Sequence, residues 1–457
     1  MLNYIWLGLV VAAVIIGGFT DNLKAVADKS FEMAEYAVMR TALPLVGIMA
    51  LWLGVMRLAE RAGLVALLAR AIRPLMCWLF PEVPHDHPAM GSMLLNMAAS
   101  ILGLGNAATP LGLRAMKDLE TLNPHPGTAT NAMCTYLAIN TSSIQLIPAT
   151  AIAVLAANRS TNPTAIVGTS IMATTCAAVA AVASAKLLQR LPFFREPPPT
   201  RPAVAGDEAP PPNAKPETSP LHEAPTLKPL TWWGQCILAA YGLFFLYLFA
   251  RLAFPGLLGA LHLPGFLAPA LASEPMKQTL FVRIVDAISK LSIPFLLSAF
   301  PLYAMLRHVK VYEEFVEGAK EGFDVGIRII PYLVAILVAI GMFRAAGGID
   351  MLSNLLRPLM VAVGFPPELL PLVLMRPLSG SGTLGIFAEL VKQCGPDSLV
   401  TRMGGTIYGS TETTFYVLAV YFGSVAVKRT RYAVLAGLTA DTVGVIASVI
   451  ICRLVFG

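Results

Sequence analysis

The chain has 457 residues, of which 56% are hydrophobic and only 13% are charged. Soluble domains usually carry about 25% charged residues, so this composition indicates a membrane protein and argues against a soluble enzyme. The formal net charge is +6, but the basic residues stand singly or in small groups at the ends of apolar runs. That distribution is typical of topology signals and argues against nucleic-acid binding.

Apolar runs of about 20 residues, the length needed to cross a bilayer, recur along the chain. The first, residues 2–19, has no basic segment before it and no small-residue cleavage site after it, so we expect a helix and not a secretion signal. Further runs cover residues 231–254, 327–343 and 432–456. No segment shows sustained alternation of polar and apolar residues, so the expected fold class is all-α, a polytopic membrane protein.

A proline-rich segment divides the chain. Residues 192–229 are rich in Pro, Ala, Glu, Asp and Thr, a composition that cannot form a core and predicts a flexible linker. The linker separates a first membrane module, residues 1–191, from a second, residues 230–457. Basic residues cluster where the linker begins, which predicts a cytoplasmic location for it. They are Lys186, Arg190, Arg195 and Arg201.

The two modules carry similar motifs in the same order, which predicts an internal repeat. In each, a Pro, a Gly and an Arg follow one another at identical spacing and precede an RPLM sequence. These are Pro44, Gly54, Arg57 and residues 73–76 in the first module, and Pro331, Gly341, Arg344 and residues 357–360 in the second. Residues 140–144 align with 411–415, and we expect each within an apolar helix. Two expected crossings between the modules favour parallel over inverted repeats.

Each module also contains a short, polar, glycine-bearing break in an apolar stretch, at residues 102–110 and 376–383. At membrane depth, a non-helical backbone is tolerated only inside protein or beside a water-filled cavity. Matching breaks in two repeats point to a transporter's binding site, where free N–H groups of helix N-termini face an anion or a polar solute. The alternative is close helix packing through small residues. The matched pair favours the cavity.

The predicted substrate-binding residues lie at these breaks and in the aligned segments that follow them. They are Gly105, Asn106, Thr109, Asn140, Thr141, Ser142, Ser379, Ser381, Thr383, Thr411, Glu412 and Thr413.

Two acidic residues, Glu412 and Asp441, fall inside apolar segments. An ionisable group at membrane depth is costly and usually functional, so we expect both to couple transport to a cation or a proton. The alternatives for Glu412 are a position near the membrane interface or a helix cap among threonines. A pairing of Asp441 with a basic residue such as Arg376 is open. The first module has Thr141 and Met172 near the equivalent positions, so the modules are not expected to be equivalent.

No motif predicts catalysis, a metal site or a cofactor. The six cysteines are isolated in apolar surroundings, and we expect them to be small buried residues. His85 and His87 lack further nearby ligands, which favours a loop. Ser-Gly-Ser-Gly at residues 379–382 does not match a nucleophile elbow, and no Walker A lysine follows a glycine loop. We therefore expect no enzymatic activity.

Four longer motifs resemble a known family. GLGNAATPLGLRAM at residues 103–116 and NTSSIQLIP at 140–148 are similar to spore maturation A-type proteins, whereas RPLSGSG at 376–382 and GSTETTFYVLAVYFG at 409–423 are similar to the B type. The chain thus resembles a fusion of two members of the nucleoside-recognition, or gate-domain, family of bacterial membrane proteins. The resemblance implies a multi-pass inner-membrane protein related to gate domains of solute-transport systems.

Together these patterns predict a secondary or facilitative transporter of a small polar or anionic solute, with a polar cavity between two repeats. Its expected partners are the lipid bilayer, the solute and a coupling cation or proton, while a homo-oligomer is left open. The alternative is a non-transporting membrane scaffold for cell-envelope or spore-wall assembly.

Overall fold

The computed structural model describes residues 2–103, 105–194, 230–254, 279–348, 351 and 364–457. These residues form helices, with no named strand among them, and four helical stretches are long and apolar enough to cross a membrane. They are Leu23–Arg61, Pro163–Leu188, Trp232–Ala253 and Ala433–Phe456. The predicted all-α polytopic membrane fold is confirmed. Most of the linker and the second RPLM sequence lie outside the described residues.

The first module begins with α1 (Leu2–Phe19) and with α2 (Leu23–Glu35), which continues through the π-helical turn η1 (Tyr36–Ala42) into α3 (Leu43–Arg61). Its remaining elements are α4 (Leu64–Leu79), α5 (Pro88–Leu102), α6 (Gly105–Thr121), α7 (Asn131–Thr141), α8 (Ala149–Ala157), η2 (Pro163–Ala165), α9 (Ile166–Leu188) and η3 (Pro192–Phe194).

The second module contains the remaining described elements. They are α10 (Trp232–Ala253), α12 (Leu280–Leu306), α13 (Val311–Ala345), η5 (Pro367–Leu369), α15 (Leu370–Met375), α16 (Gly380–Cys394), α17 (Leu399–Ser410), α18 (Thr414–Gly423) and α19 (Ala433–Phe456).

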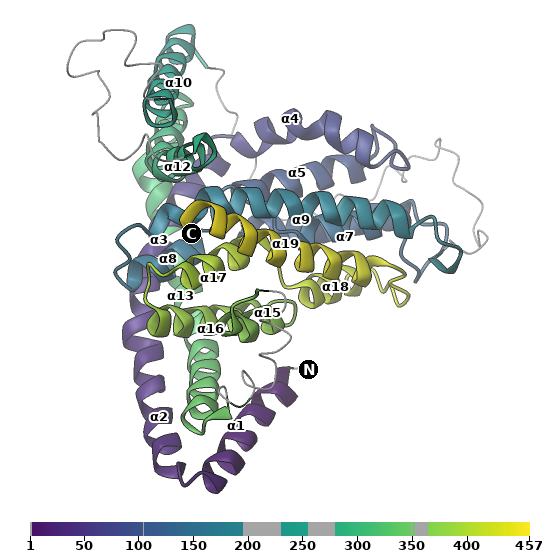
Figure 1. Ribbon diagram of the computed structural model, residues 1–457. Coiled ribbons are helices and arrows are strands. Elements are labelled where there is room, and N and C mark those ends of the chain that lie inside the picture. Colours follow the sequence, from purple (N-terminus) through teal and green to yellow (C-terminus); the bar gives the residue numbers. More distant parts are fainter. Residues whose placement is uncertain (1, 104, 195–229, 255–278, 349–350, 352–363) are drawn as a thin grey trace, which may run out of the picture.

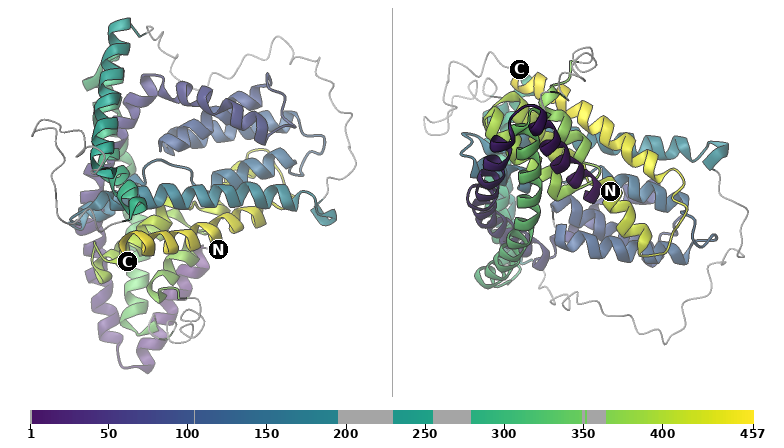
Figure 2. Two further views of the ribbon diagram at one scale, coloured as in Figure 1. Left: turned by 45° about the horizontal axis from the view of Figure 1, so that its top comes forward. Right: turned by 90° about the horizontal axis from the view of Figure 1, so that it is seen from below.

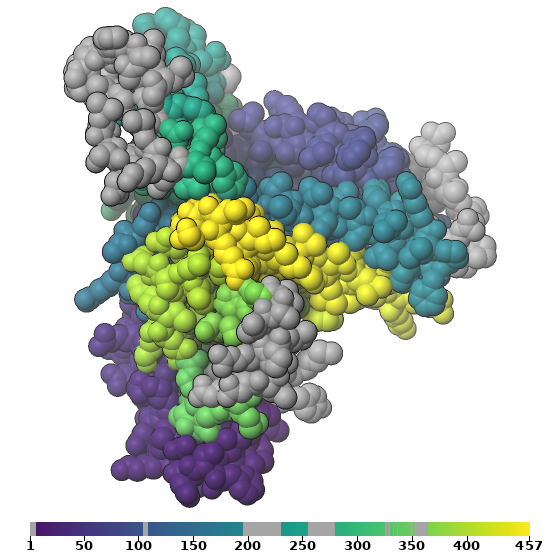
Figure 3. All heavy atoms as spheres, in the orientation of Figure 1, coloured from purple at the N-terminus to yellow at the C-terminus, as the bar shows by residue number. Residues whose placement is uncertain are grey.

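A column of helices stands on one side of the molecule, and a layer of helices that includes α9 and α19 projects from it (Figure 1). In the space-filling view the N-terminal helices and α10 extend in opposite directions along this column (Figure 3). Within it α13 lies directly against α3, because a Cβ added at Gly322 would be only 2.5 Å from the Cα of Ala50. Arg57 of α3 forms ion pairs with Glu314 and Glu321 of α13, at 3.1 and 2.8 Å. The column is thus fixed by close backbone packing and by charge.

The last helices of the two modules, α9 and α19, pack side by side and antiparallel (Figure 2). The hydroxyl of Thr406 forms hydrogen bonds to both helices. It bonds to the Thr169 hydroxyl, near the start of α9, and accepts from the Cys452 thiol, near the end of α19. Further along α9, Ala177 faces Gly444, earlier in α19. The expectation of parallel modules is therefore wrong for these helices. The count of apolar runs did not report this orientation, because it is set by how α9 and α19 pack against each other.

Candidate functional site

Both glycine-bearing breaks predicted from the sequence interrupt helices. In the first module, α5 ends at Leu102 and Gly103 adopts a φ of +79°, a left-handed conformation that favours glycine. In the second, α15 ends at Met375, and the hydroxyl of Ser379 accepts a hydrogen bond from the Gly382 amide at the start of α16. Ser379 is therefore an N-cap that terminates the break.

A second pair of breaks lies where continuous helices were expected, so that expectation is wrong. The chain leaves helical geometry after Thr141 and re-enters it at Ala149, and it does so again between Ser410 and Thr414. Ser143 adopts a positive φ of +47°, which ends α7. Thr411 is extended, with φ −132° and ψ 163°. Local backbone conformation, which hydropathy does not report, separates these short helices.

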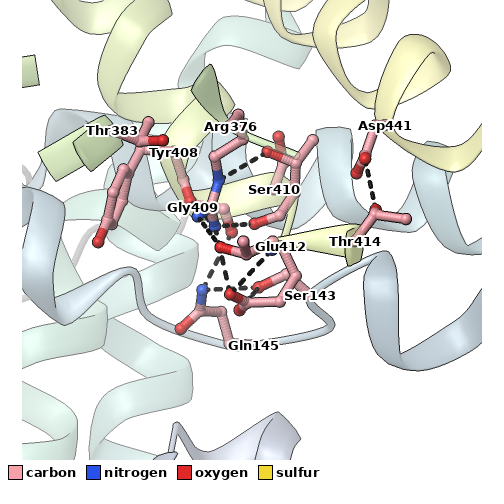
Figure 4. A network of polar contacts seen from close by, with 12 residues as sticks. Ser143, Gln145, Arg376, Thr383, Tyr408, Gly409, Ser410, Glu412, Thr414 and Asp441 are labelled. Atoms are coloured by element: carbon pink, nitrogen blue, oxygen red, sulfur yellow. Dashed lines mark hydrogen bonds and ion pairs between the residues drawn. The ribbon is translucent and has the colours of Figure 1, made fainter. Parts of the chain in front are cut away.

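The two later breaks, one from each module, meet (Figure 4). The Glu412 amide donates to the Thr141 carbonyl at 3.0 Å. The Gln145 amide nitrogen donates to the Gly409 carbonyl at 3.3 Å, and the Ser143 hydroxyl donates to Glu412 Oε2 at 3.5 Å. Because each break supplies partners to the other, their non-helical backbone is supported inside the protein.

Arg376 holds the second of these breaks in place. Its side chain is only 4% exposed, and it donates to the carbonyl of Tyr408 at 3.1 Å and to the carbonyl of Thr411. It also donates to the hydroxyls of Thr411 and Thr413, at 3.1 and 3.4 Å, and it stacks on the Tyr408 ring, 4.6 Å from the centroid. A cation with a planar fork is suited to the unpaired carbonyls at the C-terminus of α17.

Glu412 lies 3.8 Å from the Arg376 guanidinium, and its side chain is 41% exposed. The pairing left open for Asp441 is thus made by Glu412. Asp441 is 6% exposed and accepts a 2.5 Å hydrogen bond from the Thr414 hydroxyl, while its Oδ1 has no partner among the described residues. Thr414 directly follows the break, so the buried carboxyl contacts the first residue of α18.

The first module holds its own break with a neutral group. The Thr174 hydroxyl, on α9, lies 2.7 Å from the Ser142 carbonyl and 2.9 Å from the Ser143 carbonyl. Because one hydroxyl hydrogen serves both oxygens, this break is held less strongly than the one bound by Arg376.

A cavity of about 270 Å³ opens beside the joined breaks. Of the predicted substrate-binding residues, Thr109, Asn140 and Glu412 line it. Sequence reasoning did not assign several other lining residues to the site, namely Met97, Ser100, Gly103, Ala108, Ile139, Ser143, Ile144, Gln145, Tyr416, Val417 and Tyr421. No sequence pattern marks the lining residues on α5 and α18 as part of a site, because they reach the cavity through the packing of helices that are distant in sequence.

The remaining predicted residues build the breaks themselves. Four of them are buried where the later breaks meet: Thr141, Ser142, Thr411 and Thr413. At the second glycine break, the Ser381 hydroxyl lies 3.4 Å from that of Ser379, and the Thr383 hydroxyl donates to the Ser379 carbonyl at 2.6 Å. Gly105 begins α6, and the Asn106 side chain lies outside the described residues.

Where the structure is described, no three His, Cys, Asp or Glu residues lie close enough to hold a metal ion. His87 caps α5 by accepting a hydrogen bond from the Ala89 amide. Cys134 and Cys452 are buried, as expected, but Cys176 and Cys236 are exposed on the protein surface. The expectation of burial is wrong for these two because they lie on apolar helices with faces that the other described residues leave exposed.

The family model described as nucleoside recognition matches residues 42–187 and 326–428. The chain belongs to this family. Over 176 residues it is 46% identical to spore maturation protein B of Bacillus subtilis (strain 168), covering 38% of this chain and 99% of that protein. Over 195 residues it is 43% identical to spore maturation protein A of the same strain, covering 43% of this chain and 97% of that protein.

The two relatives match different parts of the chain, consistent with a fusion of A-type and B-type proteins. No solved structure matches this member of the nucleoside recognition family.

Proposed function

We propose that this protein is a secondary or facilitative transporter that moves a small polar solute across the bacterial inner membrane. The observation that carries the proposal is the cavity of about 270 Å³ beside two joined helix breaks, one from each module. Continuous helices would satisfy every backbone group without help from neighbours. Breaks that are instead supported by each other, beside a cavity with polar lining groups, are the arrangement expected for a solute site.

The direction of the modules supports the same function. The final helices α9 and α19 are antiparallel, and the family model matches a segment in each module. Inverted repeats with broken helices at their interface are common in secondary transporters, where one repeat moves against the other around a central site. We therefore propose that the modules are repeats of inverted orientation.

Charge at one end of the molecule supports a cytoplasmic linker. Lys186 lies in the last turn of α9, shortly before the linker. Arg431 of the second module donates to the Phe194 carbonyl at 3.0 Å, and the amides of Lys428 and Arg429 bind the loop that precedes α7. Basic residues from both modules thus gather at this end, as the positive-inside rule expects of the cytoplasmic face.

Glu412 and Asp441 are suited to coupling. Glu412 reaches the cavity, and Asp441 binds Thr414 two residues further along the chain. A buried carboxyl with an unpartnered oxygen is costly as an anion unless it takes up a cation or a proton. Binding at Asp441 would act on the first turn of α18, and therefore on the break that carries Glu412.

The alternative function is a non-transporting scaffold for cell-envelope or spore-wall assembly, which the names of the two relatives suggest. In a scaffold the residues around the cavity would serve only packing. Replacing Glu412 by Gln would then leave function unchanged, whereas changes at the surface or linker would impair it.

The test is the melting temperature of the purified protein with nucleosides, dicarboxylates, amino acids and cations, since a ligand that binds only the folded state raises it. We expect at least one compound to raise the melting temperature, and Glu412→Gln to abolish the rise. Glu317→Gln is the matched control, because Glu317 is exposed and pairs with Lys320 within α13. If no compound acts and Glu412→Gln behaves as wild type, the scaffold is favoured.

A further inference from the structure

The amide groups at the cavity are held in one orientation. Asn140 Nδ2 donates to the Tyr136 carbonyl at 2.9 Å, and Gln145 Nε2 donates to the Gly409 carbonyl at 3.3 Å and to the Ser143 hydroxyl at 3.0 Å. A backbone carbonyl can only accept, so each amide must direct its nitrogen at the protein. Neither amide oxygen accepts a hydrogen bond from the described residues, which leaves both oxygens for a solute.

The one charged side chain that lines the cavity in the described structure is the carboxylate of Glu412. Its Oε1 accepts from the Thr413 amide at 3.1 Å and its Oε2 from the Ser143 hydroxyl at 3.5 Å. A carboxylate offers about four lone-pair positions, so acceptor capacity remains on the exposed part of this side chain. Like the two amides, Glu412 therefore presents acceptors.

No cation balances this surface from within the cavity. Arg376 lies 3.8 Å from Glu412 and offsets part of its charge, but the guanidinium is buried and already donates four hydrogen bonds to the residues around the second break, so it does not itself line the cavity. Residues 104–107, whose side chains lie outside the described structure, are Leu, Gly, Asn and Ala, and none of them is charged. An anion entering the cavity would meet Glu412 with no cation free to bind it.

Several of the other lining residues are apolar or aromatic. They are Met97, Ile139 and Val417, together with Tyr416 and Tyr421. The volume, about 270 Å³, corresponds to roughly nine waters at about 30 Å³ each and lies below the usual range of drug-sized pockets. The space suits a compact molecule with one apolar face.

From these features we propose that the cavity selects an uncharged or cationic solute rich in hydrogen-bond donors, such as an amine or a polyol with a compact apolar body, and rejects carboxylates and phosphates. This inference rests on the transport function proposed above and narrows its substrate class. Of the two solute classes that the sequence suggested, polar and anionic, it retains the first.

The test measures the charge preference of the cavity with thiol reagents. Ser143→Cys is introduced into full-length protein carrying Cys176→Ser and Cys236→Ser, which remove the two exposed native thiols. The variant, in lipid nanodiscs, reacts with methanethiosulfonates that carry an ammonium, a hydroxyl or a sulfonate group. Each rate, followed by mass spectrometry, is divided by that of 2-mercaptoethanol with the same reagent.

We expect the ammonium reagent to react at least about tenfold faster than the sulfonate, since contact with a charged group changes affinity by about tenfold or more. Adding Glu412→Gln should lower this ratio at least about threefold without abolishing labelling by the hydroxyl reagent. Adding Glu317→Gln instead should leave the ratio unchanged.

Equal or faster reaction of the sulfonate would overturn the proposed substrate class while leaving an accessible cavity and the transport function intact. If none of the three reagents labels Ser143→Cys, the cavity is closed to solutes, and the transport function fails together with this inference.

Discussion

The two joined helix breaks each leave backbone carbonyls without helical partners, and a different kind of side chain donates hydrogen bonds to these carbonyls in each break. In the first module a neutral hydroxyl, that of Thr174, serves the carbonyls of Ser142 and Ser143. In the second, the buried guanidinium of Arg376 serves the carbonyls of Tyr408 and Thr411. Neutral and charged partners can each support a broken helix, but only the charged one permits a carboxylate beside it at low cost.

This difference assigns distinct roles to the modules. Arg376 stabilises the second break and also offsets the charge of Glu412, 3.8 Å away. The first break supplies amide and hydroxyl groups to the same cavity without a charge of its own. We therefore expect changes at the second break to affect both stability and solute selection, and changes at the first to be milder.

The largest expected effect follows from Arg376→Met. The substitution removes the donor from the carbonyls of Tyr408 and Thr411, which costs about 1–3 kcal/mol for each and about 2–6 kcal/mol together, whereas the lost pairing with Glu412, 41% exposed, adds little. The free energy of unfolding, measured with denaturant in detergent micelles, should fall by that amount. The value for Arg376→Lys should lie between those of the wild type and Arg376→Met. Arg70→Met, at an exposed position of α4, is the control. Wild-type stability of Arg376→Met would remove the distinction between the breaks.

Contact between the breaks is tested by Gly409→Ala. A Cβ at this position would lie 2.6 Å from the Cβ of Pro148 and 2.9 Å from the Ser170 hydroxyl, so the two breaks must separate. Overpacking of this kind costs about 1–3 kcal/mol, and it should also lower affinity for any solute that raises the melting temperature. Gly423→Ala, with no atom within 4 Å of the added carbon, should be tolerated. Equal melting temperatures for the two variants would show that the breaks do not need this contact.

A smaller effect is expected at the first break, from Thr174→Val. The variant keeps the shape of the side chain but removes the hydroxyl that serves two carbonyls, at a cost of about 1–2 kcal/mol. Thr175→Val is the matched control, since the Thr175 hydroxyl bonds only to Ile171 of its own helix. A loss as large as that of Arg376→Met would mean that the two breaks depend equally on their partners.

The smallest effect on stability is expected for Asp441→Asn. The Asn oxygen can still accept the hydrogen bond from Thr414, so unfolding should change by less than about 1 kcal/mol. Loss of the titratable group should instead remove any dependence of solute uptake into proteoliposomes on a proton or cation gradient. Gradient-driven uptake that persists in this variant would exclude Asp441 from coupling and leave Glu412 as the remaining candidate.

Sequence patterns predicted the features that depend on composition and local conformation. These include the helical membrane fold, the breaks at Gly103 and Ser379, and the placement of Glu412 beside a polar cavity. The breaks after Thr141 and Ser410 escaped prediction, because apolar residues flank them and hydropathy does not register three or seven residues of non-helical backbone. Their positions depend on partners from the other module.

The partnership of Arg376 with Glu412 was also beyond the sequence. The two residues are 36 positions apart along the chain and meet because the Arg376 side chain reaches the end of α17. The antiparallel course of α9 and α19 was mispredicted for a related reason, since the orientation of the modules depends on how many helices cross between them. Tertiary packing, not local propensity, determines both.

Access to Ser143 from the two sides of the membrane tests the transport function most directly. The Ser143→Cys variant, without Cys176 and Cys236, is treated with a membrane-impermeant thiol reagent in sealed right-side-out vesicles and, separately, in inside-out vesicles. A transporter whose cavity opens in turn to each side predicts labelling in both preparations, and protection in both by any solute that raises the melting temperature. Labelling from one side alone, or from neither, would contradict transport through this cavity and favour the scaffold.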